Sequence, residues 1–165
     1  MQLSSLFIGF LGTGKLPYPT LGASALATVM GLLILRFLGM ETLFMLTFVL
    51  TVIALFEVNK YIAAHPDSDK EEITIDDASG MWLSLMVSLS TAATLTLPYA
   101  IYVGTVLAFV FFLLFQNWKP STIGWMHRTL KGGLGIILSS VLSGLAGGLL
   151  SVVVLMGLER VLQAV

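Results

Sequence analysis

The chain has 165 residues, of which 57% are hydrophobic and only 10% are charged, and its formal net charge at pH 7 is -1. Soluble domains carry about 25% charged residues, so this composition and the mean hydropathy of +0.98 indicate a protein that lies in lipid. The sequence contains no cysteine, which excludes disulfides, thiol catalysis and thiolate metal sites, and it has no basic stripe with interleaved aromatics that would indicate nucleic-acid binding.

The amino-terminal segment Met1–Lys15 does not have the pattern of a secretory signal peptide. It lacks a basic first region, and Gly9 and Gly12 interrupt its apolar run before any small-residue cleavage site. We therefore expect this segment to be retained at the membrane interface.

Residues Gly9–Lys15, with the sequence GFLGTGK, match the start of a Walker A loop. The match fails at Leu16, where a Ser or Thr is needed to hold magnesium, and at Pro17 and Pro19, which prevent a helix from following at once. We interpret this stretch as a turn-rich loop and not as a nucleotide site.

Several apolar runs are long enough to cross a bilayer, whose hydrocarbon core of about 30 Å needs about 20 residues of helix. The predicted spans are Leu21–Leu38, Leu43–Ala64, Met81–Leu97, Tyr99–Phe115 and Gly133–Leu158. Short turns at Gly39–Thr42 and near Pro98 alternate with two long polar segments. The sequence therefore predicts one domain over residues 1–165, an all-α polytopic membrane bundle of about five spans.

The basic residues give this bundle an orientation. With five spans, six of the eight fall on one side: Lys15, Lys60, Lys70, Lys119, Arg128 and Lys131. Only Arg36 and Arg160 fall on the other side, and the positive-inside rule then makes the richer face cytoplasmic. Both histidines and most acidic residues share that face, so all candidate chemistry is expected on one cytoplasmic surface.

Small residues follow one face of the last predicted span. They include Ser140, Ser143 and Gly147, together with a GxxxG step from Gly144 to Gly148. Such faces let helices approach closely in lipid, and we expect this one to pack inside the bundle and not to form a dimer.

An acidic segment, HPDSDKEEITIDD, covers His65–Asp77 and ends just before the third predicted span. Asp76 and Asp77 have two interpretations. They could cap the helix and complement its dipole. They could instead ligate Mg²⁺, which takes one or two carboxylates, with Asp69 as a third oxygen ligand. The spacing alone does not decide between these interpretations.

A basic segment covers Gln116–Ser140 and carries Lys119, Arg128 and Lys131 together with several glycines. It suits a phosphate-bearing ligand, or it is a topology signal in front of a helix. His127 is better placed for phosphate contact than His65. Zinc is disfavoured because no H-x-x-x-H pair or cysteine is present, and no G-x-S-x-G nucleophile elbow occurs.

Three sequence blocks together resemble one known family. LGTGKLPYPTLGASALA, DKEEITIDDASGMW and WKPSTIGWMHRTLKGGLGII resemble, in order and interval, the blocks of the phosphatidylglycerophosphatase A family. The resemblance implies Mg²⁺-dependent hydrolysis of phosphatidylglycerophosphate to phosphatidylglycerol by a multi-pass protein of the bacterial inner membrane. It also implies that Asp76 and Asp77 are catalytic, that both ligate the metal with Asp69, and that Lys119 and Arg128 bind the substrate phosphate. The basic segment itself adds His127 and Lys131 to the expected phosphate contacts.

The chain departs from the family pattern mainly at acidic positions. The matching positions are Asp69, Asp76, Gly80, Lys119, Pro120, Arg128, Gly132, Gly133 and Gly135; Asp77 replaces Glu, Pro19 replaces Gly, and Gln116, His127, Ser139 and Ser140 each replace Asp. With Ser139 and Ser140 in place of the Asp pair, roughly half of the expected negative charge at the site is lost, which leaves Mg²⁺ with fewer anionic ligands. An alternative therefore stays open: a catalytically impaired relative that binds anionic phospholipid or a membrane partner.

Overall fold

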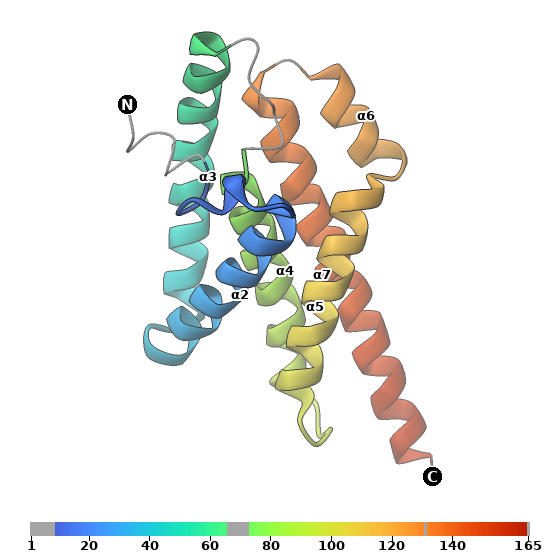
Figure 1. Ribbon diagram of the computed structural model, residues 1–165. Helices are drawn as coiled ribbons and strands as arrows, with labels where there is room; N and C mark the ends of the chain where they lie inside the picture. The colour runs from blue at the N-terminus through green and yellow to red at the C-terminus, as the bar shows by residue number, and fades with distance from the viewer. Residues whose placement is uncertain (1–8, 66–72, 131, 165) are drawn as a thin grey trace.

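The computed structural model describes residues 9–65, 73–130 and 132–164. Its elements are the 3₁₀ helix η1 (Thr13–Lys15) and the α-helices α2 (Pro19–Phe37), α3 (Gly39–Ala64), α4 (Ile75–Ala92), α5 (Ala100–Trp118), α6 (Ser121–Thr129) and α7 (Gly133–Gln163). Helices α2, α3, α4, α5 and α7 run along the bundle, while η1 and α6 lie near one end (Figure 1). This arrangement confirms the predicted all-α polytopic bundle.

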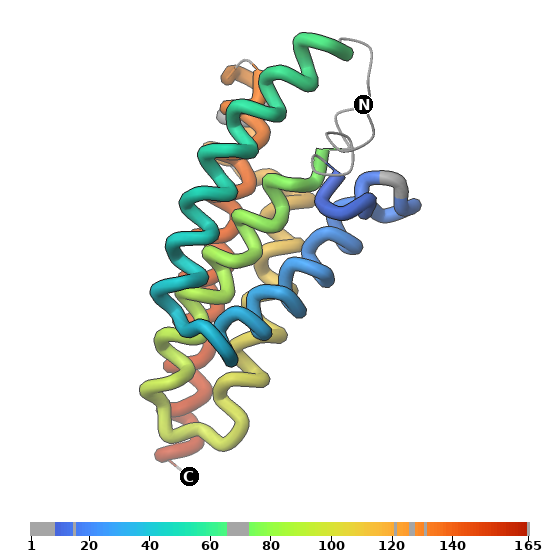
Figure 2. Tube along the Cα trace, turned by 90° about the vertical axis from the view of Figure 1, so that its left-hand side faces the viewer, coloured from blue at the N-terminus to red at the C-terminus, as the bar shows by residue number. Residues whose placement is uncertain are grey.

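Helix α4 is the central element of the bundle, in contact with α2, α3, α5 and α7 (Figure 2). Its surroundings accept hydrogen bonds from its polar side chains: Trp82 Nε1 donates to the Ala27 carbonyl at 2.8 Å, and the Ser84 hydroxyl donates to the Ala108 carbonyl at 3.0 Å. The four helices around α4 are long and apolar enough to cross a membrane. Because they shield α4 from lipid, α4 itself tolerates more polar residues.

The structure corrects several predicted boundaries. Helix α4 begins at Ile75, six residues before the expected start at Met81, so Asp76 and Asp77 lie in its first turn and do not precede it. Helix α3 begins at Gly39, so the expected turn at Gly39–Thr42 is helical. The basic segment, expected to be a loop up to the last span, contains the nine-residue helix α6.

Two contacts fix the segments that precede α4 and α7. The Thr13 hydroxyl lies 3.0 Å from the Thr74 hydroxyl, which ties the turns at residues 9–12 and η1 to the start of α4. Residues 9–12 form turns and lead into η1, so the Gly9–Lys15 stretch is rich in turns, as predicted from the sequence. On the other side, Asn59 Oδ1 accepts a hydrogen bond from the Gly133 N–H at 2.8 Å and caps the start of α7.

The small-residue face of α7 packs inside the bundle, as predicted. A Cβ atom added at Gly144 would lie 2.1 Å from the Gly80 carbonyl oxygen of α4, and one at Gly147 would lie 2.8 Å from the Phe112 backbone nitrogen of α5. Backbones at this separation leave no room for a side chain, so glycine at both positions lets α7 contact its two neighbours directly.

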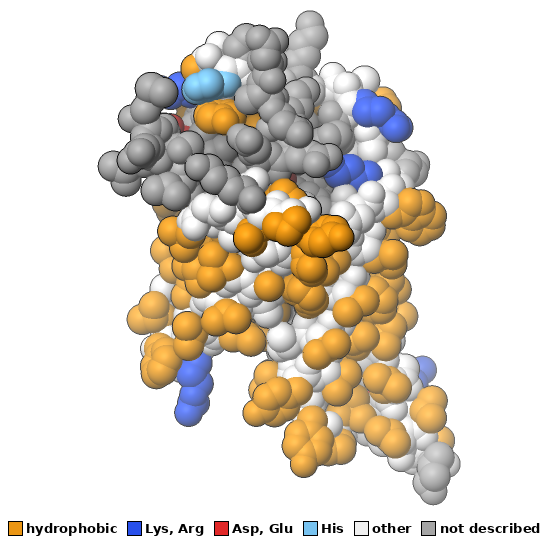
Figure 3. All heavy atoms as spheres, viewed as in Figure 1, with side chains coloured by type: hydrophobic (Ala, Val, Ile, Leu, Met, Phe, Trp, Pro, Cys, Tyr) orange, Lys and Arg blue, Asp and Glu red, His pale blue; other side chains and the backbone are white. Residues whose placement is uncertain are grey.

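Polar and aromatic residues mark the two ends of the bundle. Hydrophobic side chains cover the middle of the face in Figure 3, and basic side chains lie toward its ends. Exposed Trp118 and Trp125 lie at the end with α6, and exposed Tyr99 and Tyr102 lie at the opposite end. Such aromatic residues are typical of the two membrane–water interfaces. Lys60, whose side chain is 78% exposed, pairs with Glu57 at 3.8 Å.

Candidate functional site

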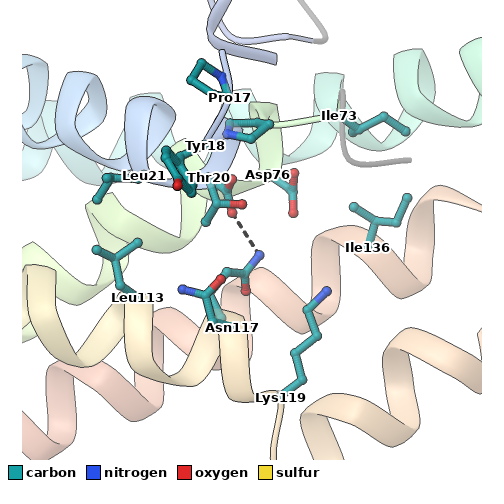
Figure 4. Close-up of a pocket in the computed structure, with 13 residues that line it drawn as sticks. Pro17, Tyr18, Thr20, Leu21, Ile73, Asp76, Leu113, Asn117, Lys119 and Ile136 are labelled. Carbon is teal, nitrogen blue, oxygen red and sulfur yellow. Dashed lines mark hydrogen bonds between the residues drawn. The ribbon is translucent and has the colours of Figure 1, made fainter. Parts of the chain in front are cut away.

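A cavity of about 660 Å³ opens at the end of the bundle where α2 and α4 begin and α5 ends (Figure 4). Its lining residues come from four separate segments: Pro17, Tyr18, Pro19, Thr20, Leu21, Ile73, Asp76, Asp77, Leu113, Gln116, Asn117, Lys119 and Ile136. The fold thus brings Asp76 and Asp77 of the acidic segment next to Lys119 of the basic segment.

Asp77 is buried, with 2% of its surface exposed, and two side chains hold its carboxyl group. Gln116 Nε2 of α5 donates a hydrogen bond to Asp77 Oδ1 at 2.8 Å, and the Thr20 hydroxyl of α2 donates another. Burial and the neighbouring charge of Asp76 raise the pKa of Asp77 well above its usual value, although these hydrogen bonds oppose the rise. Asp77 is therefore held by side chains of α2 and α5.

Asp76 is also buried, and α7 supplies its main partner. The Ser140 hydroxyl donates to Asp76 Oδ2, and Gln116 Nε2 donates in turn to Ser140 Oγ at 2.6 Å. Burial raises the pKa of Asp76 to about 6, against the opposing effects of the Ser140 hydrogen bond and the positive charge of Lys119. Gln116 and Ser140 therefore link the two carboxyl groups into one hydrogen-bonded cluster, the Asp76–Asp77–Gln116–Ser140 cluster.

Lys119 reaches the cavity because of the way α5 ends. Its backbone adopts the left-handed conformation (φ 44°, ψ 58°) as the C-cap of α5, immediately before Pro120, which disfavours a continuing helix. The Lys119 side chain points into the cavity on the side of Asp76 (Figure 4). A non-glycine residue in this conformation costs about 1–2 kcal/mol. Glycine would adopt the backbone conformation of this position without strain, whereas lysine supplies a positive charge to the cavity.

Replacement of Lys119 by Gly separates these two requirements. We expect the Lys119→Gly variant to keep or slightly raise the thermal midpoint in detergent, because relief of the left-handed strain offsets the added freedom of the unfolded chain. Binding of a phosphate monoester should weaken, because the cation in the cavity is lost. Lys119→Met, which removes the charge but keeps the strain, is the control; equal phosphate affinity in all three proteins would contradict the assignment.

The other predicted site residues lie outside the cavity or outside the described chain. Arg128 is exposed on α6 and does not line the cavity. The backbone of His127 lies on α6, but its side chain is not among those described, and Asp69 and Lys131 lie outside the described residues. His65 is exposed and stacks on Tyr61 with ring centroids 4.7 Å apart.

Several residues of the cavity were missed by the sequence analysis. Thr20 belongs to the first family-like block, and its position there is the signal that could have identified it. Tyr18 lies in the same block, whereas Asn117 carried no signal of its own. Gln116 and Ser140 were noticed only as lost acids, whereas the structure makes them the direct partners of Asp76 and Asp77.

The oxygen atoms of this cluster fit a small hard cation. Asp76 Oδ1 and Gln116 Oε1 are buried and have no hydrogen-bond partner among the described residues. No group of three or more His, Asp or Glu side chains that could hold a metal occurs in that part of the chain. Mg²⁺ does not require one, because it is commonly bound through one or two carboxylates, with waters and substrate phosphate completing its shell.

Fold and site together define a polytopic α-helical membrane protein with paired carboxyl groups and a lysine in a cavity at one end. Residues 6–155 match the family model for Phosphatidylglycerophosphatase A, and the chain belongs to this family. It is 32% identical over 76 residues to Phosphatidylglycerophosphatase A of Escherichia coli (strain K12), a match that covers 46% of this chain and 39% of that relative. No solved structure matches the chain.

Proposed function

We propose that this protein hydrolyses the phosphate monoester of phosphatidylglycerophosphate, giving phosphatidylglycerol, in a Mg²⁺-dependent reaction at the bacterial inner membrane. Family membership and the name of the relative support the reaction. The observation that carries the proposal is the cavity in which buried Asp76 and Asp77 lie beside Lys119. Phosphoryl transfer depends on positioning and on positive charge near the phosphate. Two carboxyl groups that can hold Mg²⁺, together with one lysine in the same cavity, can supply that charge to a dianionic phosphate.

The Asp76–Asp77–Gln116–Ser140 cluster, Lys119 and Thr20 each have a role in this proposal. Asp76 and Asp77 would hold Mg²⁺, which when bound supplies positive charge to the phosphoryl oxygens. Lys119 binds and neutralises the same phosphate from the end of α5. Gln116, Ser140 and Thr20 keep the two carboxyl groups in place through the hydrogen bonds described above.

The direct test uses purified protein and phosphatidylglycerophosphate in vesicles, with released inorganic phosphate as the readout. We expect release in the presence of Mg²⁺ and none with a chelator. A control substrate without a phosphate monoester, phosphatidylglycerol, should give no phosphate. Failure to release phosphate from phosphatidylglycerophosphate at any Mg²⁺ concentration would contradict the proposal.

A second candidate function is binding of an anionic phospholipid without turnover. Gln116 and Ser140, which replace acids of the family pattern, contact Asp77 and Asp76 directly, so the loss of charge falls within the cluster itself. For this candidate, we expect the unmodified protein to bind phosphatidylglycerophosphate but not to hydrolyse it.

The combined variant Gln116→Asp, Ser140→Asp distinguishes the two candidates. If the protein is an impaired relative, restoring both acids should increase Mg²⁺ affinity and produce phosphate release, because each added carboxylate is a better Mg²⁺ ligand than an amide or hydroxyl. If the protein is already active, the same variant should gain no rate. Mg²⁺ binding is measured by calorimetry, and hydrolysis by phosphate release.

A further inference from the structure

The cavity has an apolar side as well as a polar one. Leu21 of α2 and Leu113 of α5 lie together at the left of the cavity in Figure 4, and Asp76 and Lys119 lie to the right of them. A free phosphate ion or a small sugar phosphate has no hydrocarbon portion that an apolar wall could contact. An apolar wall next to a cation matches a ligand that carries a phosphate and a hydrocarbon portion together.

The apolar wall lies at the surface and next to interfacial aromatic residues. Leu21 is 48% exposed although it lines the cavity, and Tyr18, which also lines the cavity, is 73% exposed. Trp118, at the end of α5, is 70% exposed. Exposed Tyr and Trp residues at the end of a bundle lie at the level of lipid head groups, which is where the phosphate of a membrane lipid is found.

The two helices that carry this wall are both suited to contact lipid. Helices α2 and α5 are among the four that are long and apolar enough to span a membrane, and they lie next to each other in the bundle. Leu21 and Leu113 therefore place the apolar wall on two helices that can border the bilayer.

We propose that a phospholipid bearing a phosphate monoester enters this cavity sideways from the bilayer, between α2 and α5. Its phosphate binds at Lys119, and the acyl-bearing glycerol lies between Leu21 and Leu113 while the chains stay in the membrane. This route avoids withdrawing the chains into water, a cost that grows with every CH₂ group exposed. The identity of the lipid as substrate rests on the function proposed above; the route does not depend on turnover.

The first test measures lipid contact and not activity. The chain has no native cysteine, so Leu113→Cys places a single fluorophore at the opening, and Leu114→Cys places one on the neighbouring residue, which is 46% exposed and does not line the cavity. Each labelled protein is reconstituted with phosphatidic acid or phosphatidylcholine that carries bromine on its acyl chains. We expect phosphatidic acid to quench the label at 113 more strongly than phosphatidylcholine does, and both lipids to quench the label at 114 equally.

Two variants complete the quenching test. Adding Lys119→Met to Leu113→Cys should remove the preference for phosphatidic acid, because the cation that holds the phosphate is gone. Leu21→Cys reports from the opposite wall and replaces Leu113→Cys if that variant does not fold. Equal quenching by both lipids at positions 113 and 21, or a preference that survives loss of Lys119, would overturn the proposed route.

The second test connects the route to hydrolysis. Leu113→Trp fills the opening and should lower the rate on long-chain phosphatidylglycerophosphate about tenfold more than the rate on its water-soluble dibutanoyl analogue, because only the long chains must remain in the bilayer. Leu114→Trp is the matched control and should leave both rates unchanged. Equal losses on the two substrates would overturn the route; no hydrolysis of either by the unmodified protein would overturn the proposed function, while the quenching result still decides the route.

Discussion

The Asp76→Asn variant should lose phosphate release by a factor of about 10²–10⁴, the usual range for removal of a catalytic ionisable group. Asp76 contributes the one buried carboxylate oxygen of the cluster that has no partner among the described residues, Oδ1, so it is the atom most available to a cation. The amide keeps the shape of the side chain and an oxygen that can accept from Ser140. The loss should therefore reflect charge and not misfolding.

The same substitution should raise the stability of the metal-free protein. The two buried carboxyl groups of the cluster repel each other when both are ionised, and each loses hydration through burial. For these reasons, burial and the charge of Asp76 raise the pKa of Asp77. A neutral amide removes both costs. We expect a higher thermal midpoint for Asp76→Asn without Mg²⁺, and a Mg²⁺-induced rise in the midpoint only for the unmodified protein.

Glu57→Gln provides the control, because Glu57 pairs with the exposed Lys60 on α3 and does not line the cavity. This variant should keep the rate, the metal-free midpoint and the response to Mg²⁺. An Asp76→Asn protein that releases phosphate at the unmodified rate would show that Asp76 has no part in catalysis. A Mg²⁺ response that survives the substitution would show that the metal binds elsewhere.

The four candidate membrane-spanning helices were predicted well from the sequence, and the central helix α4 was predicted less well. Hydropathy identifies α2, α3, α5 and α7 because these helices are long and apolar enough to cross a membrane. Helix α4 is surrounded by protein, so its first turn can hold Asp76 and Asp77 without any cost from lipid. The hydropathy of this turn is that of a polar loop, which explains why the third span was predicted to begin only at Met81.

The site was predicted from the sequence only as far as its residue types. The separate acidic and basic segments predicted that carboxylates and a cation would meet at one end of the bundle, and Asp76, Asp77 and Lys119 do so. The roles of Gln116 and Ser140 could not be predicted, because comparison with a family pattern records which charge is lost and not which hydrogen bond replaces it. That replacement requires α5 and α7 to be placed beside α4, which only the structure provides.

Close packing of α4 and α7 should make Gly144 the least tolerant of the glycines that the structure describes. A Cβ atom at Gly144 would lie 2.1 Å from the Gly80 carbonyl oxygen and 2.9 Å from the Gly80 Cα. Both are backbone atoms, so no side chain can rotate away, and the helices must separate. We expect Gly144→Ala to destabilise the protein by about 3 kcal/mol, at the upper end of the range for overpacked cores, measured as a lower thermal midpoint in detergent.

Gly157→Ala is the matched control on the same helix. Nothing lies within 4 Å of a Cβ atom at Gly157, so alanine there should stabilise α7 by about 0.5–1 kcal/mol through its higher helix propensity. Opposite shifts of the thermal midpoint in the two variants would show that Gly144→Ala acts through the contact between α4 and α7 and not through helix propensity. Equal shifts would contradict a role for this contact. The contact also bears on the site, because Ser140 lies one turn before Gly144 on α7. Separation of α4 from α7 moves the Ser140 hydroxyl away from Asp76, so Gly144→Ala should lower phosphate release even at temperatures where the protein remains folded.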